Sequence, residues 1–213
     1  MNQRDIGGII ITFFGFLVAL TMHEAAHAFV AKFLGDTSEE TNSRATLNPI
    51  PHIDILGTIV FPAVMLFSGT SMLFGWAKRT QCDARRFKKM KRDLNLVALS
   101  GPGFNFLIAL VCGLAMRLMA LHPMQLQAGD DPVPRLLNAV AVANIVIGVF
   151  NLIPFPGSDG WKVLLNSLAY NKAQKLEQIS TPLSLVIMLL LMMGIFSPIF
   201  RIILSIYYGI FIA

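Results

Sequence analysis

The feature that most constrains this chain is an apolar stretch, residues 6–34, that carries ionisable side chains near its C-terminal end. The stretch is long enough for a helix to cross the ~30 Å hydrocarbon core of a bilayer. The ionisable side chains are His23, Glu24 and His27. Such groups are costly inside a membrane unless they bind an ion or face a polar cavity. We therefore expect a membrane helix that borders a polar site.

Composition extends this expectation to the whole chain. Of the 213 residues, 55% are hydrophobic and only 14% are charged, which is not typical of a soluble domain. Further apolar stretches cover residues 53–74, 94–120, 135–154 and 181–213, the last interrupted by Pro198. We predict a single all-α, polytopic membrane domain that ends in a helical hairpin or in one broken helix.

Positive charge is concentrated in one loop. Eight of the 17 lysines and arginines lie between Lys78 and Arg92, and the net charge is +5. A basic segment can bind nucleic acid, but this one lies between apolar stretches, so we expect it at the cytosolic face beside anionic lipid. The expected partner is therefore the lipid bilayer and not nucleic acid. Cys82 and Cys112 are too few for a disulfide scaffold and are predicted to be free thiols.

The two histidines of the first stretch have the spacing of metal ligands. His23 and His27 are four residues apart, so on a helix their side chains lie on one face, one turn apart. Two imidazoles at that spacing can bind one zinc ion, and the adjacent Glu24 can act as a general base. A pair of ordinary buried histidines beside a glutamate is the alternative.

A catalytic zinc usually has three protein ligands, so a further ligand is required. His52 and His122 are in predicted loops. Asp159 follows an apolar stretch within a proline-rich turn, which suits a fixed oxygen ligand. An aspartate there can equally cap the helix that follows.

The polar segment after the first stretch contains Pro49 and Pro51, which disfavour a helix. We predict that residues 44–51 form an extended strand or hairpin. Such a strand can bind an unwound substrate by strand addition, or it can simply connect two helices.

Three motifs together resemble the site-2 protease family of intramembrane zinc metalloproteases. They are His-Glu-Ala-Ala-His at 23–27, Gly101-Pro102 with Asn105, and Asn151 through Pro154 to Asp159-Gly160. The flanking pieces 47–49, 52–58 and 75–78 resemble a compact branch of the family that lacks a PDZ insertion. The resemblance covers the chain from about residue 6 to residue 165.

The resemblance implies that His23, His27 and Asp159 bind one zinc ion and that Glu24 is the general base. It also implies that Asn151 hydrogen-bonds the substrate backbone.

The resemblance further implies that Asn105 lines the site, from a helix packed between the other two, and takes part in binding the substrate. The chain departs from the family pattern at Ser158, where leucine is usual, and at Trp161, where a second glycine is common. Arg79 replaces a proline that often follows Gly-Trp-Ala-Lys. None of these changes removes a ligand or the base, so they bear on substrate preference.

A shared metal also constrains the topology. The histidines lie near the C-terminal end of their helix and Asp159 follows the end of the helix at 135–154, so these helices run parallel, with 94–120 antiparallel between them. Residues 53–74 must then enter and leave the membrane on one side, and Pro62 is a suitable bend. The active site and the basic loop lie on the cytosolic side in this arrangement.

We predict hydrolysis of peptide bonds in or near the transmembrane segments of single-pass membrane proteins, as in regulated intramembrane proteolysis. The predicted location is a prokaryotic plasma (inner) membrane. The alternatives are an inactive homologue that binds membrane segments and a metal transporter. An intact Glu24 argues against both, and transporters usually show internal repeats, which are not evident here.

Overall fold

The computed structural model describes residues 6–68, 75–120 and 132–212, and all regular secondary structure within them is helical. Three helices are long and apolar enough to cross a membrane: α1 (Ile6–Phe33), α4 (Met90–Ala120) and α5 (Pro132–Leu152). These helices coincide, within about one turn, with three of the predicted spans. Within the described residues, the prediction of an all-α chain with several helices long and apolar enough to cross a membrane is therefore confirmed.

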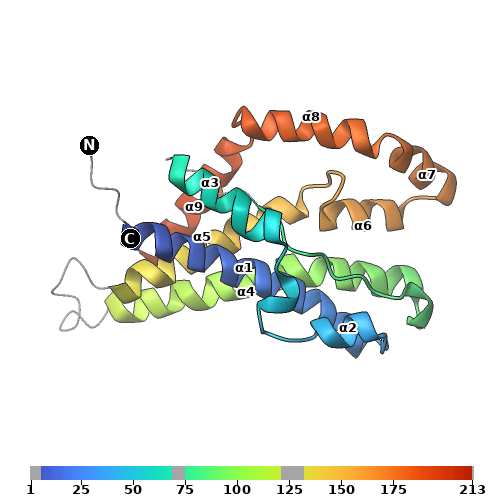
Figure 1. Ribbon diagram of the computed structural model, residues 1–213, viewed down its shortest axis with the longest axis horizontal. Coiled ribbons are helices and arrows are strands. Elements are labelled where there is room, and N and C mark those ends of the chain that lie inside the picture. The colour runs from blue at the N-terminus through green and yellow to red at the C-terminus, as the bar shows by residue number, and fades with distance from the viewer. Residues whose placement is uncertain (1–5, 69–74, 121–131, 213) are drawn as a thin grey trace.

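The three long helices pack side by side. Figure 1 shows α1 and α5 running in one direction and α4 in the opposite direction. Small residues allow the close approach: a Cβ on Gly15 of α1 would lie 2.8 Å from the backbone of Ala139 in α5. Such contacts are typical of membrane helices, which associate through close packing rather than through the hydrophobic effect.

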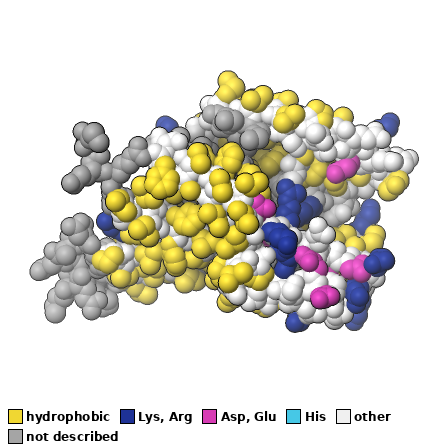
Figure 2. All heavy atoms as spheres, in the orientation of Figure 1, with side chains coloured by type: hydrophobic (Ala, Val, Ile, Leu, Met, Phe, Trp, Pro, Cys, Tyr) yellow, Lys and Arg dark blue, Asp and Glu magenta, His cyan; other side chains and the backbone are white. Residues whose placement is uncertain are grey.

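The surface is divided between an apolar part and a charged end. On the face shown in Figure 2, hydrophobic side chains gather over α1, α4 and α5, while most charged side chains lie toward the other end. The exposed large apolar residues of α4 include Leu107, Leu110, Val111, Leu114 and Leu118. An apolar surface of this kind is suited to contact with lipid.

The segment between α1 and the next apolar stretch contains two short helices and no strand, so the predicted strand or hairpin at 44–51 is wrong. It contains α2 (Glu39–Arg44) and a short 3₁₀-helix (Ile50–His52). The Ser38 side chain caps α2, which supplies an acceptor to an otherwise unpaired backbone N–H group. Pro51 lies in the first turn of the 3₁₀-helix, where a proline is tolerated.

The next apolar segment is a short helix whose start lies close to residue 76. It starts as a π-helix (Ile55–Val60) and continues as α3 (Phe61–Ser68). At 1.5 Å per residue, a helix of this length spans about 21 Å, less than the ~30 Å hydrocarbon core. The N–H of Trp76 then donates to the carbonyl oxygen of Gly57 at 3.1 Å. The two ends of this segment are therefore adjacent, which is the geometry that a re-entrant segment requires.

Two short helices follow α5 at the charged end of the molecule. They are α6 (Asp159–Ser167) and α7 (Tyr170–Gln178). In α6 the two buried residues are Asp159 and Trp161. The helix therefore brings one carboxylate into the interior.

The C-terminal region contains two helices, α8 (Ser180–Met192) and α9 (Ser197–Phe211). They do not form the predicted hairpin at 181–213: Figure 1 shows that α8 and α9 diverge at a bend instead of folding back along each other. Gly194, with a φ of +73°, lies in the bend. The arrangement is closer to the broken helix, and α9 alone packs into the core formed with α4 and α5.

Candidate active site

Three buried side chains from distant parts of the chain meet at one point. His23 and His27 lie one turn apart on α1, and Asp159 is the first residue of α6. The two Nε2 atoms are 3.1 Å apart, and Oδ2 of Asp159 lies 2.9 Å from Nε2 of His23 and 3.1 Å from Nε2 of His27. Within residues 6–68, 75–120 and 132–212, this is the one group of His, Cys, Asp or Glu residues placed to hold a metal ion.

The other ring nitrogen of each histidine faces an acceptor on α4. Nδ1 of His23 lies 2.6 Å from Oδ1 of Asn105, and Nδ1 of His27 lies 2.7 Å from the carbonyl oxygen of Val97. Because these oxygens accept hydrogen bonds, each histidine carries its proton on Nδ1 and directs the lone pair of Nε2 toward Asp159. Two lone pairs and a carboxylate oxygen therefore converge, an arrangement that is repulsive without a cation between them.

The separations between these atoms fit a zinc ion. Zinc binds histidine nitrogen and carboxylate oxygen at about 2.0–2.2 Å in a tetrahedron, which places neighbouring ligand atoms about 3.3 Å apart. The separations here, 2.9 to 3.1 Å, are only slightly shorter. Three protein ligands also leave a fourth position for water or substrate, as in catalytic zinc sites.

Asp159 is held in place by its neighbours in α6. The cap of this helix is Ser158, whose side chain accepts a hydrogen bond from the N–H of Trp161 at 3.1 Å, so Asp159 does not serve as the cap. Nζ of Lys162 lies 2.8 Å from Oδ1 of Asp159, which leaves Oδ2 directed at the histidines.

Glu24 is positioned by a backbone group. Its Oε2 accepts a hydrogen bond from the N–H of Thr80 at 2.7 Å, and Oγ1 of Thr80 donates to the carbonyl oxygen of Glu24 at 3.2 Å. Thr80 belongs to residues 75–83, which have no regular secondary structure. Glu24 lines the same cavity as His23 and Asp159, so its carboxylate is placed to exchange a proton there.

Gly101 allows α4 to approach the two histidines. A Cβ on Gly101 would lie 2.6 Å from ring atoms of His27 and 2.7 Å from Cε1 of His23, closer than real Cβ contacts. Two residues further along the helix, a Cβ on Gly103 would have no neighbour within 4 Å. Of these two glycines in the predicted motif, Gly101 is therefore the one that the site requires.

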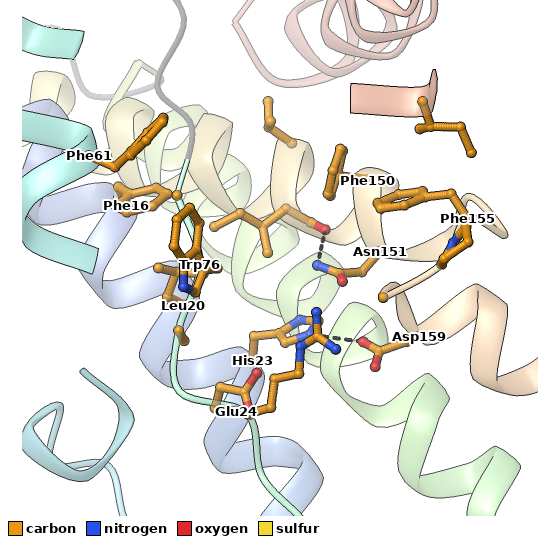
Figure 3. A pocket seen from close by; sticks show the side chains of 18 of the residues that line it. Phe16, Leu20, His23, Glu24, Phe61, Trp76, Phe150, Asn151, Phe155 and Asp159 are labelled. Atoms are coloured by element: carbon orange, nitrogen blue, oxygen red, sulfur yellow. Dashed lines mark hydrogen bonds and ion pairs between the residues drawn. The ribbon is translucent and has the colours of Figure 1, made fainter. Parts of the chain in front are cut away.

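A cavity of about 390 Å³ extends from this group of residues. Its walls are mostly aromatic and aliphatic. The labelled apolar side chains in Figure 3 are Phe16, Leu20, Phe61, Trp76, Phe150 and Phe155. The cavity is within the size range of ligand pockets and offers an apolar peptide both a low-polarity surface and one polar end.

The two predicted substrate-binding asparagines occupy different positions. Asn151 lines the cavity, and its Nδ2 donates to the carbonyl oxygen of Ile147 at 3.0 Å (Figure 3). Asn105 is completely buried behind His23 and is not part of the described cavity wall. The structure thus places the predicted substrate-binding Asn105 behind His23, where its Oδ1 faces Nδ1 of that histidine.

One buried polar residue next to the site, Asn144 of α5, is missing from the sequence predictions. It is fully buried, its Oδ1 accepts a hydrogen bond from Nδ2 of Asn105 at 2.7 Å, and its Nδ2 donates to the carbonyl oxygen of Val140 at 2.8 Å. A signal was present, because Asn144 precedes Asn151 by two helical turns and therefore lies on the same face of an apolar helix. An amide there requires a buried partner.

The remaining histidines and the cysteines are not part of the site. Nε2 of His52 donates to the carbonyl oxygen of Thr46 at 3.0 Å, which occupies that ring nitrogen. His122 lies outside the described residues, together with most of the loop that contains it. Cys82 and Cys112 are free, as predicted.

Comparison with known proteins gives several bacterial relatives. "Putative zinc metalloprotease YwhC" of Bacillus subtilis is 35% identical over 149 residues, which are 70% of this chain and 64% of the relative. "Putative zinc metalloprotease Rip2" of Mycolicibacterium smegmatis is 28% identical over 163 residues, 75% of this chain and 58% of the relative. Rip2 of Mycobacterium tuberculosis is 29% identical over 169 residues, 74% of this chain and 57% of the relative.

This chain therefore spans about three fifths of the length of these three relatives. No family model and no solved structure matches it. The aligned part is nevertheless extensive, and the motifs of the chain predict the same chemistry that the relatives are named for. We conclude that the chain belongs to the same family as these bacterial proteins, which are named putative zinc metalloproteases.

Proposed function

We propose that this protein is an intramembrane zinc metalloendopeptidase that hydrolyses peptide bonds in or near the transmembrane segments of single-pass membrane proteins. The observation that carries the proposal is the position of His23, Glu24 and His27 on a helix of membrane-spanning length, with Asp159 as the third ligand. Three ligands and a carboxylate base beside an apolar cavity suit the hydrolysis of a bond that enters the bilayer.

Each residue of the site has a distinct task in this reaction. A zinc ion held by the two histidines and Asp159 would supply Lewis acidity toward water and the scissile carbonyl. Glu24 accepts a proton from the attacking water and passes it to the leaving amine. The Thr80 N–H occupies Oε2 of Glu24, so the other carboxylate oxygen, Oε1, is the one that accepts the proton. Asn151 retains an amide oxygen and one N–H for the substrate backbone.

Residues 75–81 offer an edge to which an unwound substrate can add. The N–H groups of Trp76, Lys78 and Thr80 donate to acceptors on the protein, at 3.1, 2.9 and 2.7 Å. Because every second N–H of an extended chain points the same way, the N–H groups of Ala77 and Arg79 point to the other side. No hydrogen bond from these two groups to a described residue is present, so this edge is available to a substrate strand.

We further propose that the active-site end of the molecule faces the cytosol of a prokaryotic cell. The basic loop 78–92 lies at this end, as the positive-inside rule requires. In this orientation residues 53–74 would be a re-entrant segment, with both ends at the cytosolic side. Water that enters the cavity from the cytosolic side would then serve as the nucleophile for hydrolysis.

The proposal is tested with the purified protein in detergent and a tagged single-pass test substrate. Cleavage should be present in the wild type, absent after treatment with a zinc chelator and restored by added zinc. Glu24→Gln should bind about one zinc ion per chain and fail to cleave, because it retains the ligands and lacks the base. Zinc content is measured by elemental analysis and cleavage by the masses of the products.

Each alternative has a separate outcome. A wild type that binds zinc, binds the substrate and cleaves none of a panel of transmembrane substrates would support the inactive homologue. Zinc transport into vesicles by both the wild type and Glu24→Gln would support the transporter. Correctly folded protein that binds no zinc at all would exclude the proposed centre.

A further inference from the structure

Two cations face the cavity of the proposed active site, and one of them has no acidic partner among the described residues. The titratable side chains that line the cavity are His23, Glu24, Arg79, Asp159 and Lys162. Lys162 is paired with Asp159 at 2.8 Å. Arg79 has no carboxylate within ion-pair distance in the part of the chain that the structure describes.

Arg79 differs in this respect from nearby arginines of the same basic loop. Nε of Arg85 lies 2.9 Å from Oδ1 of Asp83, and Nε of Arg86 lies 3.4 Å from Oδ2 of the same residue. Neither of these arginines lines the cavity. Arg79 thus combines an unpaired guanidinium with a position at the site, and such a group is well suited to bind an anion.

The guanidinium of Arg79 lies between two walls of the cavity. Its backbone adjoins Thr80, whose N–H holds Glu24. Its Nη2 is 3.0 Å from the position of a Cβ on Gly157, a glycine with a φ of +99° that precedes Asp159 by two residues. The side chain therefore reaches from the segment that holds the base to the turn that carries the third ligand. A substrate that passes between them lies beside the guanidinium.

The charge of the cavity favours an anionic substrate. A bound Zn²⁺ ion would carry two positive charges, and the carboxylates of Glu24 and Asp159 balance them. Arg79 and Lys162 then add two positive charges to a cavity whose remaining walls are mostly apolar. Walls of low polarity strengthen the attraction between these cations and an anion.

We propose that Arg79, assisted by Lys162, forms a subsite that selects substrates with a carboxylate close to the scissile bond. The inference rests on the proposed protease function and narrows its substrate class. A guanidinium binds a carboxylate through two parallel hydrogen bonds, which fixes the register of the substrate in addition to its affinity. The carboxylate belongs to an aspartate or glutamate side chain, or to the C-terminus of a chain shortened by an earlier cleavage.

The test uses pairs of transmembrane substrates that differ in one charge. In the first series, glutamate replaces glutamine at successive positions around the cleaved bond. In the second, the chain ends near that bond with a free or an amidated C-terminus. For one pair we expect kcat/KM to be about tenfold higher for the charged member, since charge-assisted hydrogen bonds are strong enough for a tenfold effect. The series that contains this pair identifies the source of the carboxylate.

Variants assign the preference to the subsite. In Arg79→Gln, the ratio of kcat/KM for the charged substrate to that for the neutral substrate should fall close to one. Arg79→Glu should reverse the preference, so that a substrate with lysine in place of the glutamate is cleaved best. Arg85→Gln is the matched control, because Arg85 belongs to the same loop, is 89% exposed and does not line the cavity. It should keep the wild-type ratio.

The outcomes separate this inference from the proposed function. Equal cleavage of all pairs, or a preference that survives in Arg79→Gln, overturns the subsite and leaves the protease intact. If no substrate is cleaved, the protease proposal fails, and binding of fluorescent acidic and neutral peptides to the wild type and Arg79→Gln tests the subsite instead. If the wild type binds the acidic and the neutral peptide with equal affinity, the subsite proposal is overturned. If the preference for the charged substrate changes with the fraction of anionic lipid, Arg79 binds lipid headgroups instead. That result also overturns the subsite proposal.

Discussion

At the scale of single residues, the orientation of a predicted metal ligand depends on a side chain that does not touch it. Asn144 accepts a hydrogen bond from Nδ2 of Asn105, which leaves Oδ1 of Asn105 directed at Nδ1 of His23. Nδ2 of Asn105 also donates to the carbonyl oxygen of Ala19, at 3.1 Å. The amide is therefore held in the one orientation that keeps the proton of His23 away from the metal position.

Replacing Asn144 should weaken metal binding without removing a ligand. In Asn144→Ala, Asn105 loses the partner that fixes its amide, so we expect the dissociation constant for zinc to rise about tenfold, as for other residues that orient metal ligands. Competition with a chromophoric chelator measures this constant. Asn166→Ala, which removes an amide at the partly buried contact of α6 with Asn95, is the control. If Asn144→Ala binds zinc as tightly as the wild type, Asn144 serves helix packing and does not orient the ligand.

Two glycines of one helix should differ sharply in their tolerance of alanine. In Gly101→Ala the new methyl group would lie 2.6 Å from His27, so we expect the histidines to be displaced and both zinc binding and cleavage to be lost. Gly103→Ala meets no neighbour and should keep both, with a stability equal to or above that of the wild type, because alanine favours a helix by about 1 kcal/mol over glycine. Equal zinc content in the two variants would contradict the close approach of α4.

The sequence alone was sufficient to identify those site residues whose spacing along a helix places them together. His23, Glu24 and His27 were predictable because helical geometry places two imidazoles on one face. Asp159 was predictable as a candidate, but only the fold shows that Ser158 takes the alternative role of helix cap. Thr80 left no signal, because it acts on the base through a backbone group that nearly every residue has.

At the scale of elements, Asp36 connects three pieces of the chain around the site. It follows α1, accepts hydrogen bonds from the N–H of Ser38 at 2.9 Å and from Oγ1 of Thr41 at 2.7 Å, and accepts another from the N–H of Asp83 at 2.8 Å. These contacts join α1 to α2 and to the end of residues 75–83. Burial alone would raise the pKa of the Asp36 carboxyl. These hydrogen bonds outweigh that effect and hold the pKa below its usual value of 3.8.

The contribution of Asp36 to stability should depend on pH in a defined direction. Because the pKa is lower in the folded state, the carboxylate stabilises the fold above pH ~4 and loses this effect as the pH falls through the folded value. Asp36→Asn should therefore unfold at a lower temperature than the wild type at pH 7, and the difference should shrink in acid. Thermal unfolding in detergent between pH 7 and pH 3 measures it. A constant difference across this range would contradict the assignment.

The elements themselves were predictable to different degrees. The three long helices follow from apolar length, which is a direct consequence of bilayer thickness. Helix α2 was missed because Pro49 and Pro51 dominated the prediction, although Ser38 and the two glutamates after it are typical of a helix start. The angle between α8 and α9 could not be predicted, since apolar composition does not determine which neighbour a helix packs against.

At the scale of the whole molecule, charge distinguishes the two ends. The basic loop with Arg85 lies at the end that carries the active site, and Arg135 lies near the start of α5, at the opposite end of the bundle (Figure 1). This polarity is what a fixed orientation in the membrane requires. The polarity was predictable from sequence, because the basic residues cluster between two apolar stretches.

The orientation can be measured with single cysteines in a C82S/C112A background. Arg135→Cys should react with a membrane-impermeant maleimide on intact cells, and Arg85→Cys should react only after the cells are permeabilised, because we place the active-site end in the cytosol. Mass spectrometry of the labelled protein gives the result. Labelling of Arg85→Cys on intact cells would place the active site on the outer face.

The hydrogen bond from Thr80 to Glu24 also has a consequence for genetic variation. Its donor is a main-chain N–H, which every amino acid except proline supplies. In a library of all substitutions at position 80, Thr80→Pro is therefore the one change that deletes this donor. Most point mutations at this position leave the contact with the base in place. Insertions or deletions within residues 75–83 shift the main chain itself. These changes would therefore break the hydrogen bond to Glu24.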